Sequence, residues 1–127
     1  MIAGIGTDII EVDRIKKQLS EQSGLKEDLF TSCEIDYCES KINKAQHYAA
    51  RFAAKEAFLK ALGSGLINGM RFTDIEIRND EAGKPSIQLY GKVLEYFHQL
   101  NISSIHLSIS HIGSIANAIV LTEKQPN

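Results

Sequence analysis

The longest helical pattern in the chain covers residues 45–62, and with the turn that follows it reads AQHYAARFAAKEAFLKALGSG over residues 45–65. The segment is rich in alanine and contains no glycine or proline before position 63, which favours a stable helix. Gly63 and Gly65 then predict its end. Apolar residues occur nearly all round the helix, which is more apolar surface than a 127-residue domain obviously needs for its own core, and this favours assembly of several copies. The segment therefore predicts a long central helix.

The patterns on either side of this helix predict an α+β fold. Apolar runs and alternation predict strands over residues 2–12, 72–78, 86–89, 105–111 and 115–122. Shorter helices are expected over residues 13–19, 31–41 and 91–100, with a loop over 20–28. Both faces of the first strand are apolar or small, which is typical of a strand covered on both sides. Strand pairs joined by short turns indicate an antiparallel sheet packed with the long helix.

Length and composition exclude several classes of protein. The 127 residues suffice for one core, so we expect a single domain over residues 1–127. The net charge of −2 argues against a nucleic-acid partner, and no apolar run approaches the ~20 residues of a membrane helix. The N-terminus has no basic region, and Asp8 interrupts its apolar run, so it does not resemble a signal peptide. Cys33 and Cys38 match no zinc or redox spacing, which favours reduced thiols in a cytoplasmic protein.

Glu56 is a candidate functional residue because it projects from a small, apolar face of the long helix. At 100° per residue its neighbours within about 60° are Ala45, Ala49, Phe52, Ala53, Leu59 and Gly63. Lys60, one turn on, is the polar residue of that face. A carboxylate in such surroundings needs a partner, which Lys60 or a metal ion would supply. The alternative is an ordinary Glu–Lys pair on a solvated helix, worth about 0.3–0.5 kcal/mol.

Asp8 supports the same argument from a different element. It lies in the middle of the first strand, among isoleucine, glycine and threonine, where burial is expected. The alternative is an acid on an edge strand that faces water. Two buried carboxylates from separate elements would suit a hard cation, since Mg²⁺ takes one or two carboxylates together with water or substrate phosphate oxygens.

Three further features have a structural explanation beside the functional one. His111 ends an apolar strand face next to a turn, where a lone histidine is more often structural. Gly63, Ser64 and Gly65 could admit a ligand close to the backbone, although a helix cap explains Gly63 equally well. His47, Arg51 and Lys55 form a basic stripe, which is usually a solvated face.

Five blocks of the sequence, in order and over nearly the whole chain, resemble holo-acyl-carrier-protein synthases. They are IGTDIIEV at 5–12 followed by Arg14, FT at 30–31 with Glu34 and Tyr37, RFAAKEAFLKALG at 51–63, GKP at 83–85 and LSISH at 107–111. The long-helix block is the most specific, and it is similar to the signature of the wider phosphopantetheinyl transferase superfamily. The chain departs from the family's usual pattern at Ile112, where a threonine is common.

The resemblance implies a small phosphopantetheinyl transferase fold and a homotrimer with active sites at subunit interfaces. It implies that Asp8 and Glu56 hold Mg²⁺, with Lys60 near the diphosphate of coenzyme A. Arg14 would meet an acidic carrier protein. The resemblance places the following residues along coenzyme A: Arg51, Gly63, Ser64, Gly65, Lys84, Pro85 and His111.

The implied reaction moves phosphopantetheine from coenzyme A to a serine of apo-acyl-carrier protein, releases 3′,5′-ADP and supports fatty acid biosynthesis. Glu56 and Lys60 are then the candidate catalytic residues. The base that deprotonates the serine is either Glu56, through a water, or a group on the carrier. The rival interpretation is a non-catalytic module that holds coenzyme A or the carrier. Such a module would keep the basic residues but would not need two buried carboxylates.

Overall fold

Helices and antiparallel strands alternate along the chain as an α+β fold, which confirms the predicted class. The computed structural model describes residues 1–126, so Asn127, the last residue of the expected domain, lies outside the described residues. The elements are β1 (Ile2–Glu11), α1 (Val12–Glu21), α2 (Leu25–Leu29), α3 (Ser32–Glu39), α4 (Lys44–Leu62), the 3-10 turn η1 (Phe72–Asp74), β2 (Ile75–Asn79), β3 (Pro85–Leu89), α5 (Gly91–Gln99), β4 (Ile102–Ile112) and β5 (Ile115–Lys124).

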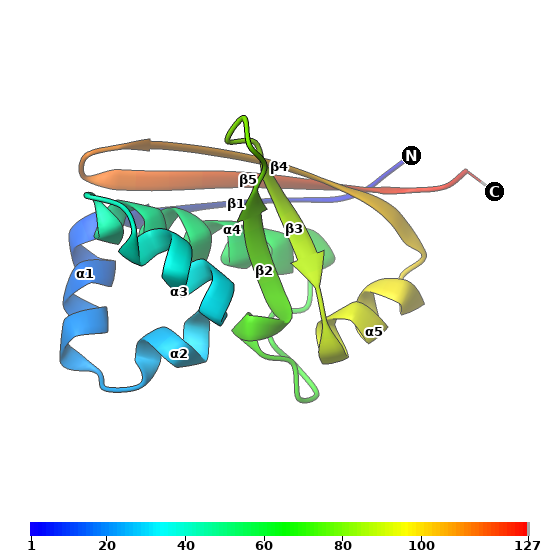
Figure 1. Cartoon of the computed structure of the whole chain (residues 1–127). Coiled ribbons are helices and arrows are strands. Elements are labelled where there is room, and N and C mark those ends of the chain that lie inside the picture. The colour runs from blue at the N-terminus through cyan, green and yellow to red at the C-terminus, as the bar shows by residue number, and fades with distance from the viewer. Residues whose placement is uncertain (127) are drawn as a thin grey trace.

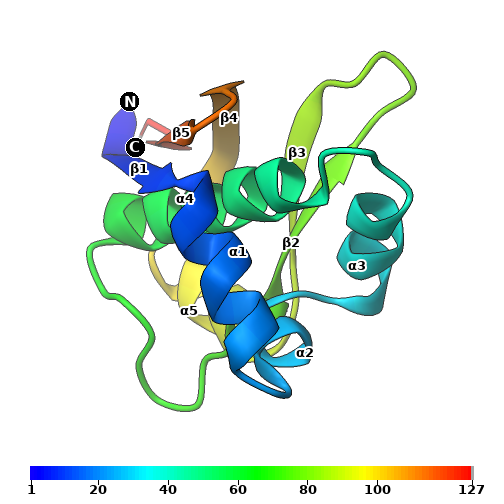
Figure 2. The ribbon, with the colours of Figure 1, turned by 90° about the vertical axis from the view of Figure 1, so that its left-hand side faces the viewer.

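Helix α4 lies at the centre of the molecule, as the sequence predicted. An antiparallel sheet in the order β1-β5-β4 covers one side of it. Helices α1 and α3 and strand β2 contact its other sides, and β2 pairs with β3 in a separate hairpin (Figure 1). Figure 2 shows α1 descending from the end of β1 and crossing in front of α4. The element order agrees with the sequence prediction except for α2, which lies in the segment expected to be a loop.

Two glycines let β1 lie directly against α4. A Cβ atom at Gly6 would lie 2.0 Å from the carbonyl oxygen of Ala57, and one at Gly4 would lie 2.1 Å from that of Ala61. No side chain fits in that space, so glycine is required at both positions. Because side chains alternate along a strand, the side chain of Asp8 points to the same side as these glycines, toward α4.

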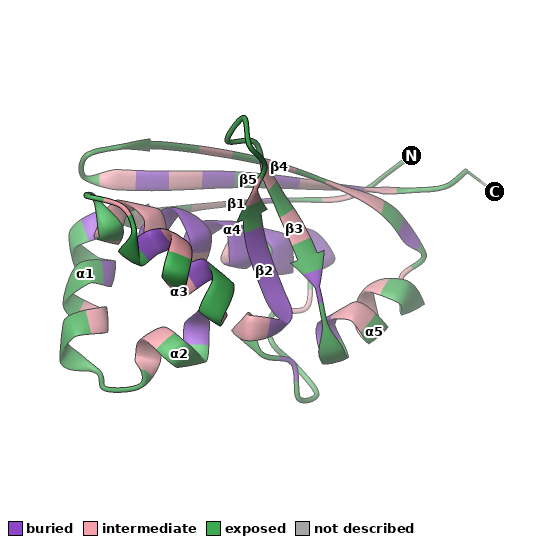
Figure 3. Ribbon diagram, in the orientation of Figure 1, coloured by how far each residue is buried: buried purple, intermediate pink, exposed green. Residues whose placement is uncertain are grey.

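The opposite face of the three-stranded sheet is open, which corrects the prediction that the first strand is covered on both sides. Ile5 and Ile9 are 66% and 67% exposed, although both are large apolar residues. The same face of β5 carries Ile119, which is 45% exposed, whereas the residues beside it that face α4, Ala118 and Val120, are fully buried (Figure 3). Nothing in residues 1–126 covers this outer face with a second layer.

None of the helices in the described residues is both long and apolar enough to cross a bilayer.

Candidate active site

The side chains of Asp8 and Lys60 meet where β1 crosses α4. The Lys60 ammonium donates to the Asp8 carboxylate at 3.1 Å and to the Thr7 carbonyl at 3.0 Å. Asp8 is largely shielded, with 18% of its side chain exposed, while Lys60 is 55% exposed. Within residues 1–126, Lys60 makes no ion pair with Glu56. The simple pair along one helix is therefore not formed, and Lys60 bridges the helix to the strand instead.

Glu56 lies half-buried beside this pair. The pKa of its carboxyl is raised, first because burial disfavours the charged form and second because the Asp8 carboxylate is close by. Lys60 offsets part of this effect. Two carboxylates that lie close together in a shielded place would be stabilised by a cation. Glu56 is therefore close enough to Asp8 for the charge of one carboxylate to affect the other, and both lie beside Lys60.

A groove of about 350 Å³ opens beside these residues, lined by Glu56, Leu59, Lys60, Gly63 and Gly65. Gly63 ends α4 in the left-handed conformation, with φ +79°, and its N–H donates to the carbonyl oxygens of Leu59 and Lys60. Gly63 is therefore a helix cap, and the loop it begins also borders the groove. Ser64 lies in the same loop, and its hydroxyl donates to the carbonyl oxygen of Gly65.

The donor set at this place fits Mg²⁺. In residues 1–126 no three side chains of histidine, cysteine, aspartate or glutamate gather as a metal cluster. Mg²⁺ does not need such a cluster, because it binds through one or two carboxylates and fills its other positions with water or phosphate oxygens. Asp8 and Glu56 would supply the two carboxylates, and the adjoining groove leaves room for a phosphate group.

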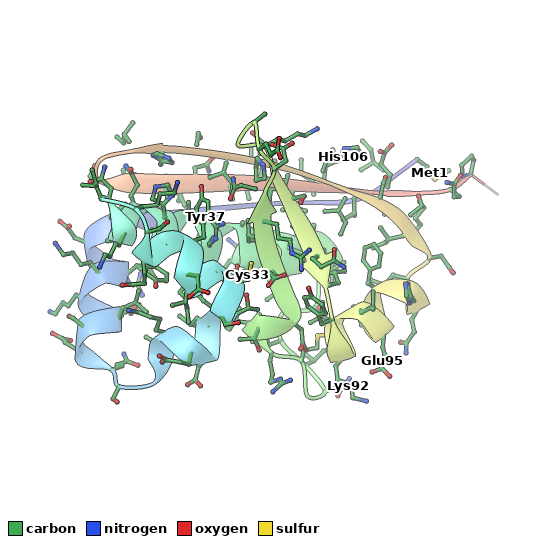
Figure 4. The ribbon with its side chains drawn as sticks, in the orientation of Figure 1. Met1, Cys33, Tyr37, Lys92, Glu95 and His106 are labelled. Carbon is green, nitrogen blue, oxygen red and sulfur yellow. The ribbon has the colours of Figure 1, made fainter. Side chains whose placement is uncertain are left out.

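Arg51 forms a second cluster, on another side of α4. Only 4% of Arg51 is exposed, so the expected solvated stripe is wrong for this residue. Its guanidinium donates to the amide oxygen of Asn79 at 2.8 Å and lies 4.1 Å from the centre of the Tyr37 ring. Figure 4 shows Tyr37 on α3. The Nε atom of Arg51 is buried without a partner among the described residues. In the same residues no carboxylate lies within 4.0 Å of it, so this buried cation has no counter-charge.

Other basic side chains lie near Arg51, around the same tyrosine. The ring of His47 lies 5.7 Å from Tyr37 and 6.2 Å from the ring of His111. The ammonium of Lys41 lies 4.7 Å from the centre of the Tyr37 ring. The pKa of His47 is lowered, first by burial and then by the positive charges of Arg51, His111 and Lys41. The cluster would therefore attract an anion.

The sequence pointed to only part of this cluster. Arg51 and His111 were predicted site residues, whereas His47 was left on a solvated stripe and Lys41 was not singled out. The sequence signal of His47 is weak, since it lies near Tyr37 only because α3 packs against α4. Lys41 is four residues after Tyr37, so its position was within reach of sequence reasoning and was overlooked. The burial of Lys55, the third residue of the stripe, was also missed, because its partner Glu34 lies 21 residues away.

Lys84 and Pro85 lie in the β2–β3 hairpin. Lys84 is exposed in the turn, and its N–H donates to Asp80 at 2.8 Å. Pro85 begins β3 and pairs with Asn79, the partner of Arg51. The hairpin is therefore joined to the Arg51 cluster and not to the Asp8–Glu56 pair.

The two clusters lie on different sides of α4. Arg51 and Glu56 are five residues apart, which rotates their side chains by about 140° at 100° per residue. Lys60 lies about 180° from Arg51 by the same geometry. A single chain thus brings Asp8, Glu56, Lys60 and the Gly63–Gly65 loop together, but it does not bring Arg51 to them.

Arg14 is exposed on the first turn of α1, close to the end of β1. It borders a hollow of about 240 Å³ together with Ile9, Glu11 and Ile115. Among residues 1–126 it makes no ion pair with Glu11 or Asp13, which was the structural alternative. Its guanidinium is thus available to a partner.

Known proteins resemble this chain over nearly its full length. A profile of the 4′-phosphopantetheinyl transferase superfamily matches residues 4–119. A holo-acyl-carrier-protein synthase from Geobacter metallireducens is 48% identical over 125 residues, which are 98% of this chain and 99% of that protein.

Solved structures of such synthases share the fold. One from Bacillus anthracis, in complex with coenzyme A (3′,5′-ADP), is 38% identical with a TM-score of 0.81, and covers 98% of this chain and 99% of its own. One from Helicobacter pylori, in complex with coenzyme A, is 33% identical with a TM-score of 0.80, and covers 94% of this chain and 99% of its own. The chain therefore belongs to the 4′-phosphopantetheinyl transferase superfamily, within the family of holo-acyl-carrier-protein synthases.

Proposed function

We propose that this enzyme transfers the 4′-phosphopantetheine group from coenzyme A to a serine of apo-acyl-carrier protein, with Asp8 and Glu56 as its metal-binding carboxylates. The observation that carries the proposal is the contact of Asp8 with Lys60 across β1 and α4 at 3.1 Å, beside a groove that Glu56 and Lys60 line. A site of this kind suits a diphosphate substrate. The product carrier supports fatty acid biosynthesis, and we place the protein in the cytoplasm as one phosphopantetheinyl transferase domain over residues 1–127.

The reaction forms a bond between the serine oxygen and the phosphorus that bears pantetheine, and breaks the bond from that phosphorus to the 3′,5′-ADP oxygen. Transfer of this kind depends mostly on positioning and on neutralising charge. Mg²⁺ bound by Asp8 and Glu56 would supply Lewis-acid charge at the diphosphate. Lys60 is exposed enough to reach a substrate, and its ammonium would offset charge that develops on the leaving oxygen. The serine proton passes to Glu56 through a water, or to a group of the carrier.

The Arg51 cluster supports the binding of coenzyme A. A buried guanidinium without a counter-charge is costly, and an anionic ligand would remove that cost. Coenzyme A carries a diphosphate and, as its product 3′,5′-ADP implies, a phosphate on the ribose. We assign Arg51, His111, Lys84 and Pro85 to coenzyme A as the resemblance implies, and add Lys41 and His47 on the positions found here.

A homotrimer with sites shared between subunits would join the two clusters. The Asp8–Glu56 site and the Arg51 cluster lie on different sides of α4. One coenzyme A molecule would therefore reach both more readily if one subunit supplied the Asp8–Glu56 site and its neighbour supplied the Arg51 cluster. The exposed outer face of the sheet, with Ile5, Ile9 and Ile119, would provide the apolar contact between copies. The apolar surface of α4, which in the sequence alone suggests assembly, is covered instead by other elements of the same chain.

The decisive experiment incubates the protein with coenzyme A, Mg²⁺ and an apo-carrier protein, and measures the mass of the carrier. We expect the mass of the carrier to rise by one phosphopantetheine group in the presence of Mg²⁺ and to stay constant when the metal is chelated. A carrier that binds but gains no mass would favour the non-catalytic module.

A further inference from the structure

Lys55 and Glu34 form a fully buried ion pair that the proposed reaction does not use. Both side chains are 0% exposed, and the Lys55 ammonium donates to the Glu34 carboxylate at 2.7 Å. The same ammonium donates to the carbonyl oxygens of Leu29 at 2.7 Å and of Phe72 at 3.0 Å. All three of its protons are therefore engaged.

Glu34 completes a junction between segments that are distant in the sequence. Its carboxylate accepts from the N–H of Thr31 at 3.0 Å, which caps α3, and from the N–H of Ile77 at 2.9 Å, which belongs to β2. With Lys55 on α4, this one pair connects the end of α2, the start of α3, the 3-10 turn, β2 and the central helix. It therefore fixes how β2 lies against α4.

Stability alone does not explain such a pair. Removing two charges from water is expensive, and apolar residues of similar size are often as stabilising or more so. The surroundings are apolar, since the Lys55 ammonium lies 5.2 Å from the centre of the Phe30 ring. An apolar pair would not fix the orientation of the two elements. The hydrogen bonds of Lys55 and Glu34 are directional, so they fix both the rotation of α4 and its position along its axis relative to β2.

The pair lies next to the contact between Arg51 and the hairpin. Arg51 is one turn before Lys55 on α4, and Asn79 follows Ile77 by two residues on β2. The Asp8–Glu56 contact depends on a different junction, the close approach of the β1 glycines to α4. A change at Lys55 or Glu34 would therefore move the Arg51 cluster relative to the hairpin while leaving the two metal carboxylates together.

We propose that Lys55 and Glu34 are positioning residues for coenzyme A: they hold α4 and the β2–β3 hairpin in the relation that the Arg51 cluster needs. The proposal rests on the proposed function. The Lys55–Glu34 pair should therefore affect the binding of coenzyme A, but neither the binding of the metal nor the binding of the carrier.

The test compares Lys55→Met, the double variant Lys55→Met with Glu34→Gln, and Glu34→Asp. Lys55→Met leaves a buried carboxylate unpaired and should lower the melting temperature most. The double variant removes both charges, and its amide oxygen can still accept from one of the two backbone N–H groups that Glu34 binds, so it should melt at a higher temperature than Lys55→Met. Glu34→Asp keeps both charges but shortens the reach of the carboxylate.

The expected result is a separation of kinetic constants in the folded variants. Because losing a hydrogen bond between a charged group and its ligand typically weakens binding by about one to two orders of magnitude, the KM for coenzyme A and its calorimetric dissociation constant should rise about 10- to 100-fold. The kcat, the KM for carrier and the Mg²⁺ concentration for half activity should change less than about threefold. An unchanged KM for coenzyme A in folded Glu34→Asp and in the folded double variant overturns the proposal. If the double variant does not fold, Glu34→Asp decides alone.

Glu76→Gln is the matched control. Glu76 is also a buried acid of β2 tied to α3, through Thr31 at 2.8 Å, but its other partners are Arg78 and Tyr90 and not α4. This variant should lose stability and keep its KM for coenzyme A. A wild-type protein that transfers no phosphopantetheine would refute the proposed function instead, and the calorimetric measurement would still test the positioning of the ligand.

Discussion

At the scale of single residues, the proposed function assigns the metal-binding role to Asp8 and Glu56. Each is partly buried, and neither belongs to the apolar clusters that hold the fold together. We expect Asp8→Ala and Glu56→Ala each to lower the transfer rate at least ~100-fold while the protein stays folded, because each removes one metal carboxylate. The rate is measured by carrier mass at saturating coenzyme A, and folding by circular dichroism.

Asp28→Ala is the control for these variants, since Asp28 is an exposed acid on α2. It should keep full activity. Activity within a few-fold of the wild type in Asp8→Ala or in Glu56→Ala would contradict the assignment of the metal site.

We propose that Arg14 recognises the carrier and takes no part in the chemistry. It is exposed near the end of the Asp8 strand, with Lys16 and Lys17 on the same helix. Complementary charge mainly accelerates encounter and weakens with salt. We therefore expect Arg14→Glu to raise the KM for carrier at least ~10-fold at low salt and to leave the KM for coenzyme A nearly unchanged. Steady-state kinetics with each substrate varied in turn measures this, and a constant KM for carrier would move the docking surface elsewhere.

At the scale of elements, the contact between β1 and α4 positions Asp8 and Glu56, the carboxylates proposed to bind the metal. Gly6 has no room for a side chain, since a Cβ atom would lie 2.0 Å from a backbone oxygen of α4. Gly6→Ala should therefore push the strand away, destabilise the fold by about 1–3 kcal/mol and separate Asp8 from Glu56. Thermal melting and the Mg²⁺ dependence of the rate report these two effects.

Gly113→Ala is the matched control for Gly6→Ala. Gly113 lies in the β4–β5 turn and does not have a positive φ, and a Cβ atom there would meet open space out to 4 Å. This variant should melt like the wild type. Equal melting of Gly6→Ala and Gly113→Ala would show that β1 is free to shift on α4.

The sequence predicted those elements whose signals are local. The alanine-rich run indicated α4 and its glycine cap, and the structure contains both. Helix α2 was missed because it has only five residues and begins after Gly24, in a polar segment. The burial of Arg51 and Lys55 was missed for another reason. It depends on Asn79 and Glu34, which tertiary packing alone brings close.

At the scale of the whole molecule, the site too has a part that local sequence signals predict and a part that only tertiary packing creates. Asp8 and Glu56 could be paired from the sequence because each acid stands out from apolar neighbours on its own element. Helix geometry already placed Arg51 and Glu56 on different sides of the long helix. That one chain does not bring the two residues together became clear only from the structure, in which other elements of the same chain cover α4. The exposed apolar face of the sheet, and not the surface of α4, is therefore the candidate interface between subunits.

The last prediction concerns that open face. Burying an isoleucine contributes about 1.5–3 kcal/mol, so Ile5, Ile9 and Ile119 of each copy would together favour assembly strongly. Light scattering at micromolar concentration should give three times 14.1 kDa. Ile5→Glu should shift the protein to monomer and lower activity with it, because a monomer keeps its two clusters apart.

Ile42→Glu is the control. Ile42 is 100% exposed but lies before α4, outside the strands of the sheet, and its substitution should leave the mass of the assembly unchanged. A stable monomer with full activity would refute the shared site, since the two clusters of one chain would then suffice to bind coenzyme A and transfer its phosphopantetheine.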